Sequence, residues 1–422
     1  MFKTPRGLRL HIGIFGRRNV GKSSLINALT RQKVSIVSDV AGTTTDPVEK
    51  PMELLPIGPV VFIDTAGVDD DSFLGAMRTA RTRKIFDRTD LAIIVTTGEG
   101  WGTFEEELLK EFDNRAIPFI VVFNKSDQET PDSNVIKKIK GKNILTVCTD
   151  ATDSMGLFDL REAIIQKTPP DIINAPKIIS DLIKPGELVV LVVPIDKEAP
   201  KGRLILPQVQ TIREILDSNA YCIVVKENEL PTALQGLKTK PAIVVTDSQA
   251  FLKVAADTPK DVPMTSFSIL FARVKGNLNE LVLGAMTIDK LKSGDRVLIA
   301  EACTHHPVTD DIGTVKIPRW LTQYVGGELQ FGHAQGHDYP DDLERYRLII
   351  HCGSCMFNRR EMLSRMMHAK RAGVPITNYG LTIAYTLGIF ERALEPFPLI
   401  LEMYRRAKKR DSLAKAPQMN LD

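Results

Sequence analysis

The chain has 422 residues, too many for one hydrophobic core, and the usual domain size of roughly 100 to 200 residues predicts three domains. Apolar residues make up 43% and charged residues 25%, which excludes a disordered or fibrous protein. The net charge of +3 gives no electrostatic signal for nucleic acid or membranes, and we expect neither as a partner. No run reaches the ~18 apolar residues of a membrane span, and the N-terminus lacks the apolar stretch of a signal peptide, so we expect a cytoplasmic protein.

The first part of the chain alternates strand-like apolar runs with helix-like stretches, as in a parallel sheet covered by helices. The strand-like runs cover residues 10–15, 60–63, 91–95, 119–123 and 144–148. Prolines at positions 169, 170, 176 and 185 then mark a boundary, because proline interrupts regular structure. We predict an α/β domain over residues 1–170.

Two further α/β domains are expected after this boundary. Short β-rich runs at residues 188–194, 221–225 and 242–245 alternate with helical patterns such as 209–216. Strand-like runs recur at residues 297–300, 328–331, 347–351 and 375–378, again with helix-like segments between them. We predict a small α/β domain over residues 171–260 and a C-terminal α/β domain over residues 261–422.

A phosphate-binding loop follows the first strand-like run. The run from Gly16 to Ser23 fits the pattern G-x-x-x-x-G-K-[ST] between a strand and a helix. Its glycines let backbone N–H groups converge on phosphate oxygens, Lys22 neutralises the outer phosphates, and the Ser23 hydroxyl is a Mg²⁺ ligand. The residues expected to contact the nucleotide here are Gly16, Asn19, Val20, Gly21, Lys22, Ser23 and Ser24.

Two polar motifs follow later strand-like runs and identify the nucleotide. Asp64 can orient Mg²⁺ through water, and the N–H of Gly67 can approach the γ-phosphate. In the run from Asn124 through Lys125 to Asp127, the Asp127 carboxylate can accept two hydrogen bonds from guanine, whereas adenine offers neither donor. The predicted fold class is therefore a Ras-like P-loop GTPase domain that binds GTP.

Two weaker matches complete the predicted GTPase site. Thr44 lies in a polar run at the spacing of the segment that closes over Mg²⁺, and it is the expected metal-binding hydroxyl. The loop at residues 149–151 matches a base-backing loop loosely and adds Ala151 to the expected nucleotide contacts. We expect hydrolysis to depend on Lys22, Thr44 and Gly67. It should be slow, because Val68 cannot orient the attacking water as glutamine does.

A cysteine and histidine cluster lies in the last third of the chain. Cys303 follows one strand-like run, and Cys352 and Cys355 directly follow another. Because ligands gather at the carboxyl edge of an open parallel sheet, the two stretches can converge on one metal, with His305 and His351 as further ligand candidates. Three thiolates plus imidazole suit zinc or an iron–sulfur cluster, and both remain open at this point.

The first domain resembles the bacterial tRNA-modification and ribosome-assembly GTPases. The resemblance lies in the loop that contains Asn19 and in the Gly-Thr-Thr-x-Asp run that begins at Gly42. It implies that Asn19 helps to bind K⁺ beside the phosphates, which would stimulate hydrolysis.

The full chain resembles the HydF family of FeFe-hydrogenase maturation GTPases, in which C-x-H and then H-C-x-x-C follow the GTPase domain. The matching residues are Cys303, His305, His351, Cys352 and Cys355. The resemblance implies a 4Fe–4S cluster on the three cysteines, with an exchangeable fourth iron site for His305, His351, a carboxylate or water. It further implies a homodimer, joined by the middle domain, that accepts a diiron precursor from radical-SAM maturation enzymes and delivers it to apo FeFe-hydrogenase under control of GTP.

The alternative is an RNA-modification or ribosome-assembly GTPase with a structural zinc site, whose first domain would look almost identical. The near-neutral charge and the lack of an aromatic and basic stripe count against it. A zinc-dependent enzyme ranks last, because no glutamate adjoins the ligands as a general base.

Overall fold

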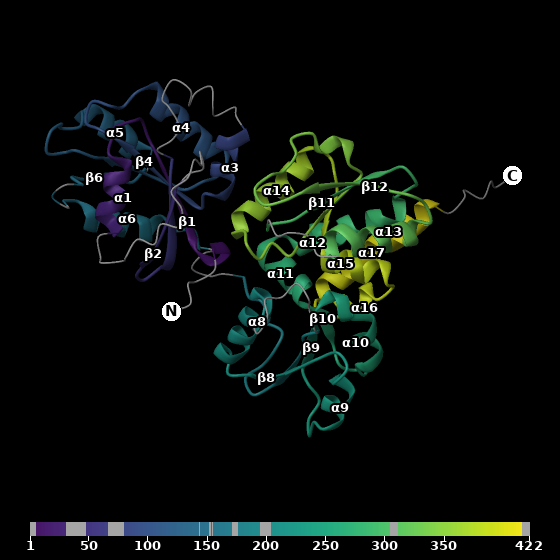
Figure 1. The fold of residues 1–422 in the computed structure, drawn as a ribbon. Helices are drawn as coiled ribbons and strands as arrows, with labels where there is room; N and C mark the ends of the chain where they lie inside the picture. Colours follow the sequence, from purple (N-terminus) through teal and green to yellow (C-terminus); the bar gives the residue numbers. More distant parts are fainter. Residues whose placement is uncertain are drawn as a thin grey trace. The chain divides into compact units, whose positions relative to one another are not determined.

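The computed structural model describes residues 6–30, 48–65, 80–142, 144–151, 153, 155–170, 176–194, 204–303 and 311–415. The chain divides into two compact units, Met1–Ala175 and Pro176–Asp422, whose helices and strands are drawn in Figure 1. Each unit has hydrophobic clusters of its own. Within the described ranges, no helix is both long enough and apolar enough to cross a membrane.

The first unit is built on a six-stranded sheet with the order β2-β3-β1-β4-β5-β6. All neighbours pair in parallel except β2 and β3. The strands are β1 (Leu10–Phe15), β2 (Val48–Leu54), β3 (Gly58–Asp64), β4 (Leu91–Thr96), β5 (Phe119–Phe123) and β6 (Thr146–Cys148). The sequence did not predict β2, because Pro51 and three charged residues interrupt its apolar pattern; as an edge strand it tolerates the proline.

Helices cover both faces of this sheet. They are α1 (Lys22–Thr30), α3 (Ala80–Arg88), α4 (Thr103–Asn114), α5 (Ser133–Gly141) and α6 (Leu157–Lys167). Successive strand residues point to opposite faces, so Ile93 packs in one core with Leu160, whereas Ile94 packs in a second core with Phe112. Burial on both faces explains the continuous apolar runs that predicted these strands.

The second unit contains two four-stranded parallel sheets, with the orders β10-β9-β7-β8 and β12-β11-β13-β14. The first sheet comprises β7 (Leu188–Val192), β8 (Tyr221–Val225), β9 (Ile243–Thr246) and β10 (Met264–Ser266). The second comprises β11 (Arg296–Ala300), β12 (Gln330–Ala334), β13 (Leu348–His351) and β14 (Ile376–Asn378). In both sheets the strand order reverses between the first and third strands, which is where ligands bind in open α/β sheets.

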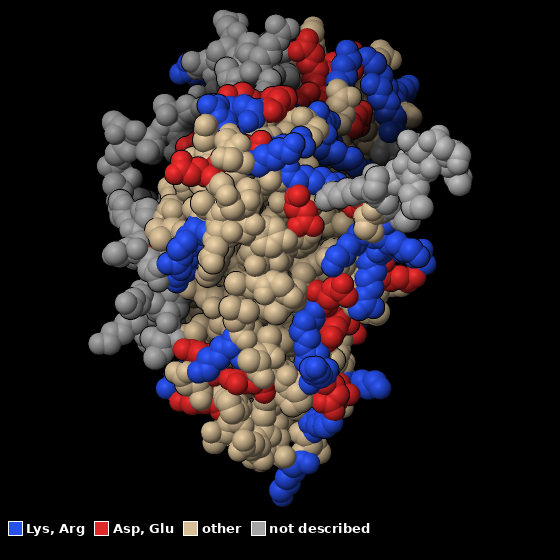
Figure 2. All heavy atoms as spheres, turned by 90° about the vertical axis from the view of Figure 1, so that its right-hand side faces the viewer, with Lys and Arg blue, Asp and Glu red and all other residues tan. Residues whose placement is uncertain are grey.

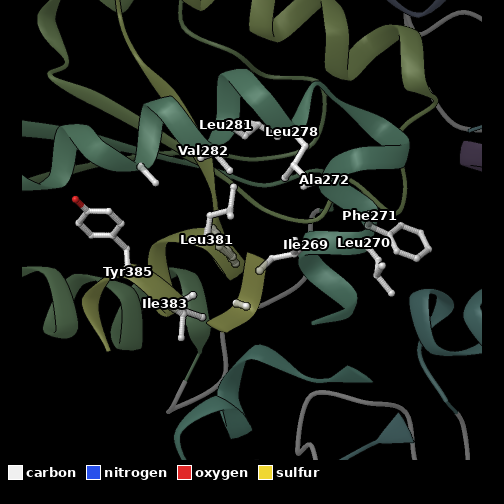
Figure 3. Packing of buried hydrophobic residues seen from close by; sticks show 14 of the residues in the cluster. Ile269, Leu270, Phe271, Ala272, Leu278, Leu281, Val282, Leu381, Ile383 and Tyr385 are labelled. Carbon is white, nitrogen blue, oxygen red and sulfur yellow. The ribbon is translucent and has the colours of Figure 1, made fainter. Parts of the chain in front are cut away.

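One continuous core joins the two sheets of the second unit. Figure 3 shows side chains of α11, α12 and α15 that contribute to it. The helices are α8 (Leu206–Asp217), α9 (Leu230–Gln235), α10 (Phe251–Asp257), α11 (Phe267–Lys275), α12 (Leu278–Ala285), α13 (Ile317–Val325), α14 (Arg359–Arg371), α15 (Tyr379–Thr386), α16 (Phe390–Leu394) and α17 (Pro398–Lys415).

The predicted boundary at residue 260 falls inside the first sheet of this unit. β10 lies beyond that residue and pairs in parallel with β9. Its three residues, Met-Thr-Ser, are too few to give a strand signal in the sequence.

The surface carries charges of both signs, in line with the small net charge of +3. Figure 2 shows Lys and Arg side chains interspersed with Asp and Glu.

Candidate functional site

The phosphate loop lies between β1 and α1, and two of its glycines are required by close contacts. Gly16 has φ +147°, and a Cβ atom there would lie 2.1 Å from the carbonyl oxygen of Val95. Gly21 has φ +90°, and its Cβ would lie 2.3 Å from Nδ2 of Asn124. Any side chain at either position would therefore displace the loop. Asn19 also has a left-handed backbone, with φ +64°, which asparagine tolerates better than most residues.

The predicted Mg²⁺ ligands lie at the N-terminus of α1. The Ser23 hydroxyl donates a 2.7 Å hydrogen bond to Oδ2 of Asp64, the last residue of β3. The buried Lys22 ammonium donates to the carbonyl oxygens of Gly16 and Arg17, at 2.6 and 2.7 Å. A hydroxyl and a carboxylate are oxygen ligands suited to Mg²⁺. Lys22 bonds to the phosphate loop, where it is predicted to neutralise the outer phosphates. Ser24, the next residue, is exposed.

The end of the site that is predicted to bind the base is organised by Asn124, which joins three loops. Its Nδ2 donates to the Val20 carbonyl at 2.9 Å, and its Oδ1 accepts from the Thr149 hydroxyl at 3.1 Å. The Ser126 N–H donates to the Thr149 carbonyl at 3.2 Å, so the loosely matched loop at residues 149–151 does lie at this end. Ala151 is buried there and Asp127 is exposed. Lys125 takes a left-handed backbone, with φ +57°.

An ion pair that no sequence motif indicated holds the phosphate loop against α4. Arg17 makes two bonds to the carboxylate of Glu105 in α4, at 3.0 and 3.1 Å, and Glu105 is fully buried. The Arg17 guanidinium also lies 5.5 Å from the ring centroid of Phe104. The two partners are 88 positions apart, so no local sequence pattern links them.

Three predicted site residues, Thr44, Gly67 and His305, lie outside the described residues.

The three cysteines follow the two strands that flank the switch point of the last sheet. Cys303 follows β11 and Cys352 directly follows β13, and these strands pair with Ala300 opposite His351. The Cys352 N–H donates to the Ala300 carbonyl at 2.8 Å, and the Ala302 N–H donates to Cys352 Sγ at 3.1 Å. The predicted convergence of the two stretches is therefore present in the structure.

The thiols are partly buried and, as thiolates, would repel one another. Burial, followed by the neighbouring Cys355 thiol, raises the pKa of Cys352 to about 12 and that of Cys303 to about 11. Burial also raises the pKa of Cys355, against the opposing positive charge of Lys275. A bound metal must therefore displace protons from these thiols.

His351 is fully buried beneath the cysteine loop, with both ring nitrogens engaged. Its Nε2 accepts from Nη1 of Arg365 at 3.0 Å, and its Nδ1 lies 3.0 Å from the Cys352 carbonyl oxygen. Burial and then the Arg365 charge lower the pKa of His351 to about 3, so the ring is neutral. As a ligand, His351 would have to give up the bond from Arg365; this role stays a prediction.

A carboxylate lies close to Cys303. Glu301 is buried, accepts a 2.9 Å hydrogen bond from the Tyr379 hydroxyl, and its charge contributes to the raised pKa of Cys303. Burial of Glu301 just beyond β11 was not predicted, although the sequence analysis left a carboxylate open as the fourth ligand.

The three cysteine thiols are soft donors that suit zinc or an iron–sulfur cluster. Among the described residues, no three His, Cys, Asp or Glu side chains are grouped so that they could hold a metal ion. The Ala302 N–H bonded to Cys352 Sγ is also the kind of contact that tunes iron–sulfur clusters.

Comparison with known proteins finds three matched segments, one for each of the three predicted domains. A family model described as 50S ribosome-binding GTPase matches residues 11–125. The hydrogen maturase F dimerization domain matches residues 178–276, and the hydrogen maturase F tetramerization domain matches residues 279–396. The two hydrogen maturase F matches together span just over half of the chain.

The curated relatives described here each match a little over a third of the chain. The tRNA modification GTPase MnmE of Caldicellulosiruptor saccharolyticus is 31% identical over 172 residues, which is 39% of this chain and 37% of that protein. The MnmE of Prochlorococcus marinus (strain NATL1A) is 37% identical over 162 residues, which is 37% of this chain and 34% of that protein. The chain thus spans about a third of the length of these relatives. A solved structure, the G domain of the T. maritima FeoB iron transporter, covers 38% of this chain and 99% of its own at 22% identity, with a TM-score of 0.30.

These matches confirm the predicted fold class of a P-loop GTPase domain followed by two further α/β domains. The GTPase domain makes the chain a GTP-hydrolysing enzyme that binds GTP and Mg²⁺. The other two matches are to a dimerization and a tetramerization domain. With two domains specific to hydrogen maturase F behind its GTPase domain, the chain belongs to the hydrogen maturase F family, the GTPases of hydrogenase maturation.

Proposed function

We propose that this chain is a GTP-controlled scaffold that holds a 4Fe–4S cluster and a diiron precursor and delivers the precursor to apo FeFe-hydrogenase. The observation that carries the proposal is the convergence of Cys303, Cys352 and Cys355 at the switch point between β11 and β13. Three soft thiolates at the ligand-binding edge of a parallel sheet favour an iron–sulfur cluster. Membership of a hydrogenase maturation family supports this cargo over others.

In the nucleotide site, each residue has a role that follows from its chemistry. Lys22 would transfer its ammonium from the loop carbonyls to the outer phosphates, and Ser23 would exchange its hydrogen bond to Asp64 for a bond to Mg²⁺. Asp64 would then hold the metal through water. The exposed Asp127 would accept two hydrogen bonds from guanine.

Other nucleotide contacts rest on the sequence. Thr44 would complete the Mg²⁺ shell, and Gly67 would sense the γ-phosphate. Asn19 would help to hold K⁺ and so stimulate a slow hydrolysis. Ala151 would back the base.

In the cluster site, Cys303, Cys352 and Cys355 would hold three irons. The cluster would supply a fourth iron whose ligand can be exchanged, which suits a carrier that must release its cargo. The Ala302 N–H would stabilise the Cys352 thiolate through its 3.1 Å contact to Sγ. The candidates for the fourth ligand are His305, His351, Glu301 and water.

The proposed partners follow from the cargo and from the self-association domains. The chain would form a homodimer through the middle domain, receive the diiron precursor from radical-SAM maturation enzymes in the cytoplasm, and pass it to apo FeFe-hydrogenase. GTP state would control association with these proteins. The dimerization and tetramerization matches support the homodimer but do not identify the other partners.

Anaerobic reconstitution with iron and sulfide tests the proposal. Iron and sulfide content and the EPR spectrum are measured for the wild type, for Cys352→Ala and for the control Cys148→Ala, which removes a cysteine at the end of β6 in the GTPase unit. We expect about four irons in the wild type and in the control, and a strongly reduced cluster signal in Cys352→Ala.

The same measurement separates the alternative function. Tight zinc with no iron signal in the wild type would sink the carrier proposal and favour an RNA-modification or ribosome-assembly GTPase with a structural zinc site. Equal iron loading of Cys352→Ala and wild type would show that the cluster lies elsewhere.

A further inference from the structure

Helix α11 ends at Lys275, whose side chain is buried against the cysteine loop. Its ammonium is enclosed, with 3% of the residue exposed, and donates a 2.8 Å hydrogen bond to the carbonyl oxygen of Phe357, two residues beyond Cys355. From the other side, Nη1 of Arg359 donates to the carbonyls of Val274 and Gly276, at 2.5 and 3.1 Å. The end of α11 and the segment that follows the cysteines therefore hold each other in place.

The charge of Lys275 acts on the cysteine site. The ammonium is buried and bonds to a backbone carbonyl two residues beyond Cys355, so its positive charge lies against the cysteine loop. Burying an ammonium is costly unless negative charge lies close by. Three thiolates on an iron–sulfur cluster carry net negative charge, so a loaded site would supply that compensation.

Lys275 comes from a different domain than the thiols. It lies in the segment that matches the dimerization domain, residues 178–276, whereas all three cysteines lie in the segment that matches the tetramerization domain. Two residues earlier on α11, Arg273 donates to the carbonyls of Lys177 and Ile178 and pairs with Asp181 at 2.7 Å. The last turn of α11 therefore bonds both to the start of the middle domain and to the cysteine loop.

We propose that Lys275 is a positioning residue of the cluster site, which the middle domain supplies to hold the cysteine loop and to favour the reduced, more negative cluster. The inference rests on the proposed function, because it concerns a cluster bound by the three cysteines. The potential of an iron–sulfur cluster depends on nearby charge and burial, so loss of one buried cation should make reduction harder.

Two substitutions separate the charge of Lys275 from its hydrogen bond. Lys275→Gln keeps an N–H donor for the Phe357 carbonyl and removes the charge, whereas Lys275→Arg keeps the charge. Lys370→Met is the matched control, because Lys370 is an exposed lysine on α14, the helix that follows the cysteine loop. Each reconstituted full-length variant is titrated with reductant under EPR, and its iron content, circular dichroism and GTP hydrolysis are measured beside it.

We expect Lys275→Gln to hold as much iron as the wild type and to show a more negative midpoint potential. A change of about tenfold in the ratio of oxidised to reduced cluster at a fixed potential corresponds to about 59 mV for one electron. Lys275→Arg and Lys370→Met should keep the wild-type potential, and GTP hydrolysis should be unchanged in all three. If Lys275→Gln fails to fold, a lower potential in Lys275→Met supports the inference.

An unchanged potential in a folded, iron-loaded Lys275→Gln protein overturns the inference and leaves the scaffold proposal intact. A shift of the same size in Lys370→Met also overturns it, because the effect would then not depend on the buried position. A wild type that binds no iron–sulfur cluster sinks the scaffold proposal itself, and this inference with it.

Discussion

His351 shows how one buried residue can hold the cysteine loop in place through its neighbours. The ring is neutral, because burial and the charge of Arg365 lower its pKa to about 3. Arg365 is itself enclosed, with its guanidinium 4.7 Å from the ring centroid of Tyr339 and 4.4 Å from that of Phe357. This stack fixes the imidazole against the backbone of Cys352 and so positions the cysteine loop.

The metal-free chain should therefore lose stability in acid. A histidine whose folded pKa is depressed stabilises the fold above its unfolded pKa of about 6.5, and this contribution is lost as the pH falls toward 3. The loss is at most about 5 kcal/mol at 1.36 kcal/mol per pKa unit. We expect the melting temperature of the second unit to fall between pH 6.5 and 4, as followed by the fluorescence of Trp320 in a Trp101→Phe background.

His351→Asn is the control for this acid transition. The variant should be less stable at pH 7, because the contacts of the ring are lost, but its melting temperature should depend less on pH below 6.5. An equally steep fall in His351→Asn would show that another group causes the acid sensitivity.

At the level of single residues, sequence reasoning found the groups whose chemistry is carried by a motif. The phosphate loop and the three cysteines belong to this class, because each pattern states its ligand directly. Lys275 and Glu105 could not be found, since each acts on residues more than 80 positions away through the fold alone. His351 was found, but the arginine that engages its ring was not.

At the scale of elements, β8 presents exposed apolar side chains on the middle domain. It is an edge strand of its sheet, and Tyr221 and Val224 on it are 49% and 44% exposed. An apolar edge strand with unpaired backbone groups readily pairs with another chain. Because this domain matches a dimerization domain, we expect a second copy of the chain to cover β8.

Val224→Lys tests this interface. A lysine on an edge strand disfavours strand pairing, so the variant should dissociate at protein concentrations where the wild type is associated, and sedimentation velocity measures the difference. Leu252→Lys is the matched control, because Leu252 is an exposed apolar residue on α10 of the same domain. Wild-type association of Val224→Lys, or equal dissociation of both variants, would place the interface elsewhere.

The elements that the sequence predicted are those with strong apolar patterns. β1, β5 and β8 have the predicted bounds, because each is a five- or six-residue run of mainly apolar residues. β2 and β10 escaped prediction, since one is an edge strand with a proline and the other has three residues. Whether such a short or edge segment forms a strand depends on its contacts with the rest of the sheet, and a local sequence pattern does not contain those contacts.

At the scale of the whole molecule, the two sheets of the second unit have the same topology, but the cysteines of the candidate cluster site follow strands of the last sheet only. In both, the strand order reverses between the first and third strands. Cys303 and Cys352 lie beyond this point in the last sheet, whereas Asp247 follows β9 at the corresponding place in the middle sheet. The topology would therefore allow a ligand site at the same edge of either sheet, and the residues of the loops after the strands decide whether one forms.

The separate cores of the two units predict separate unfolding transitions. The first unit is held by its two clusters on either side of the six-stranded sheet, and the second by one cluster of its own. The chain has two tryptophans, Trp101 in the first unit and Trp320 in the second, so Trp320→Phe and Trp101→Phe leave one fluorescent reporter for each unit.

Ligands should then stabilise one unit at a time. GTP with Mg²⁺ at 100 times its Kd should add about 2.7 kcal/mol to the free energy of unfolding of the first unit, which raises its melting temperature by roughly 5 to 10 °C. The Trp320 transition should stay in place, and iron–sulfur reconstitution should raise it while leaving that of Trp101 unchanged. Two reporters that move together with either ligand would show that the units unfold as one.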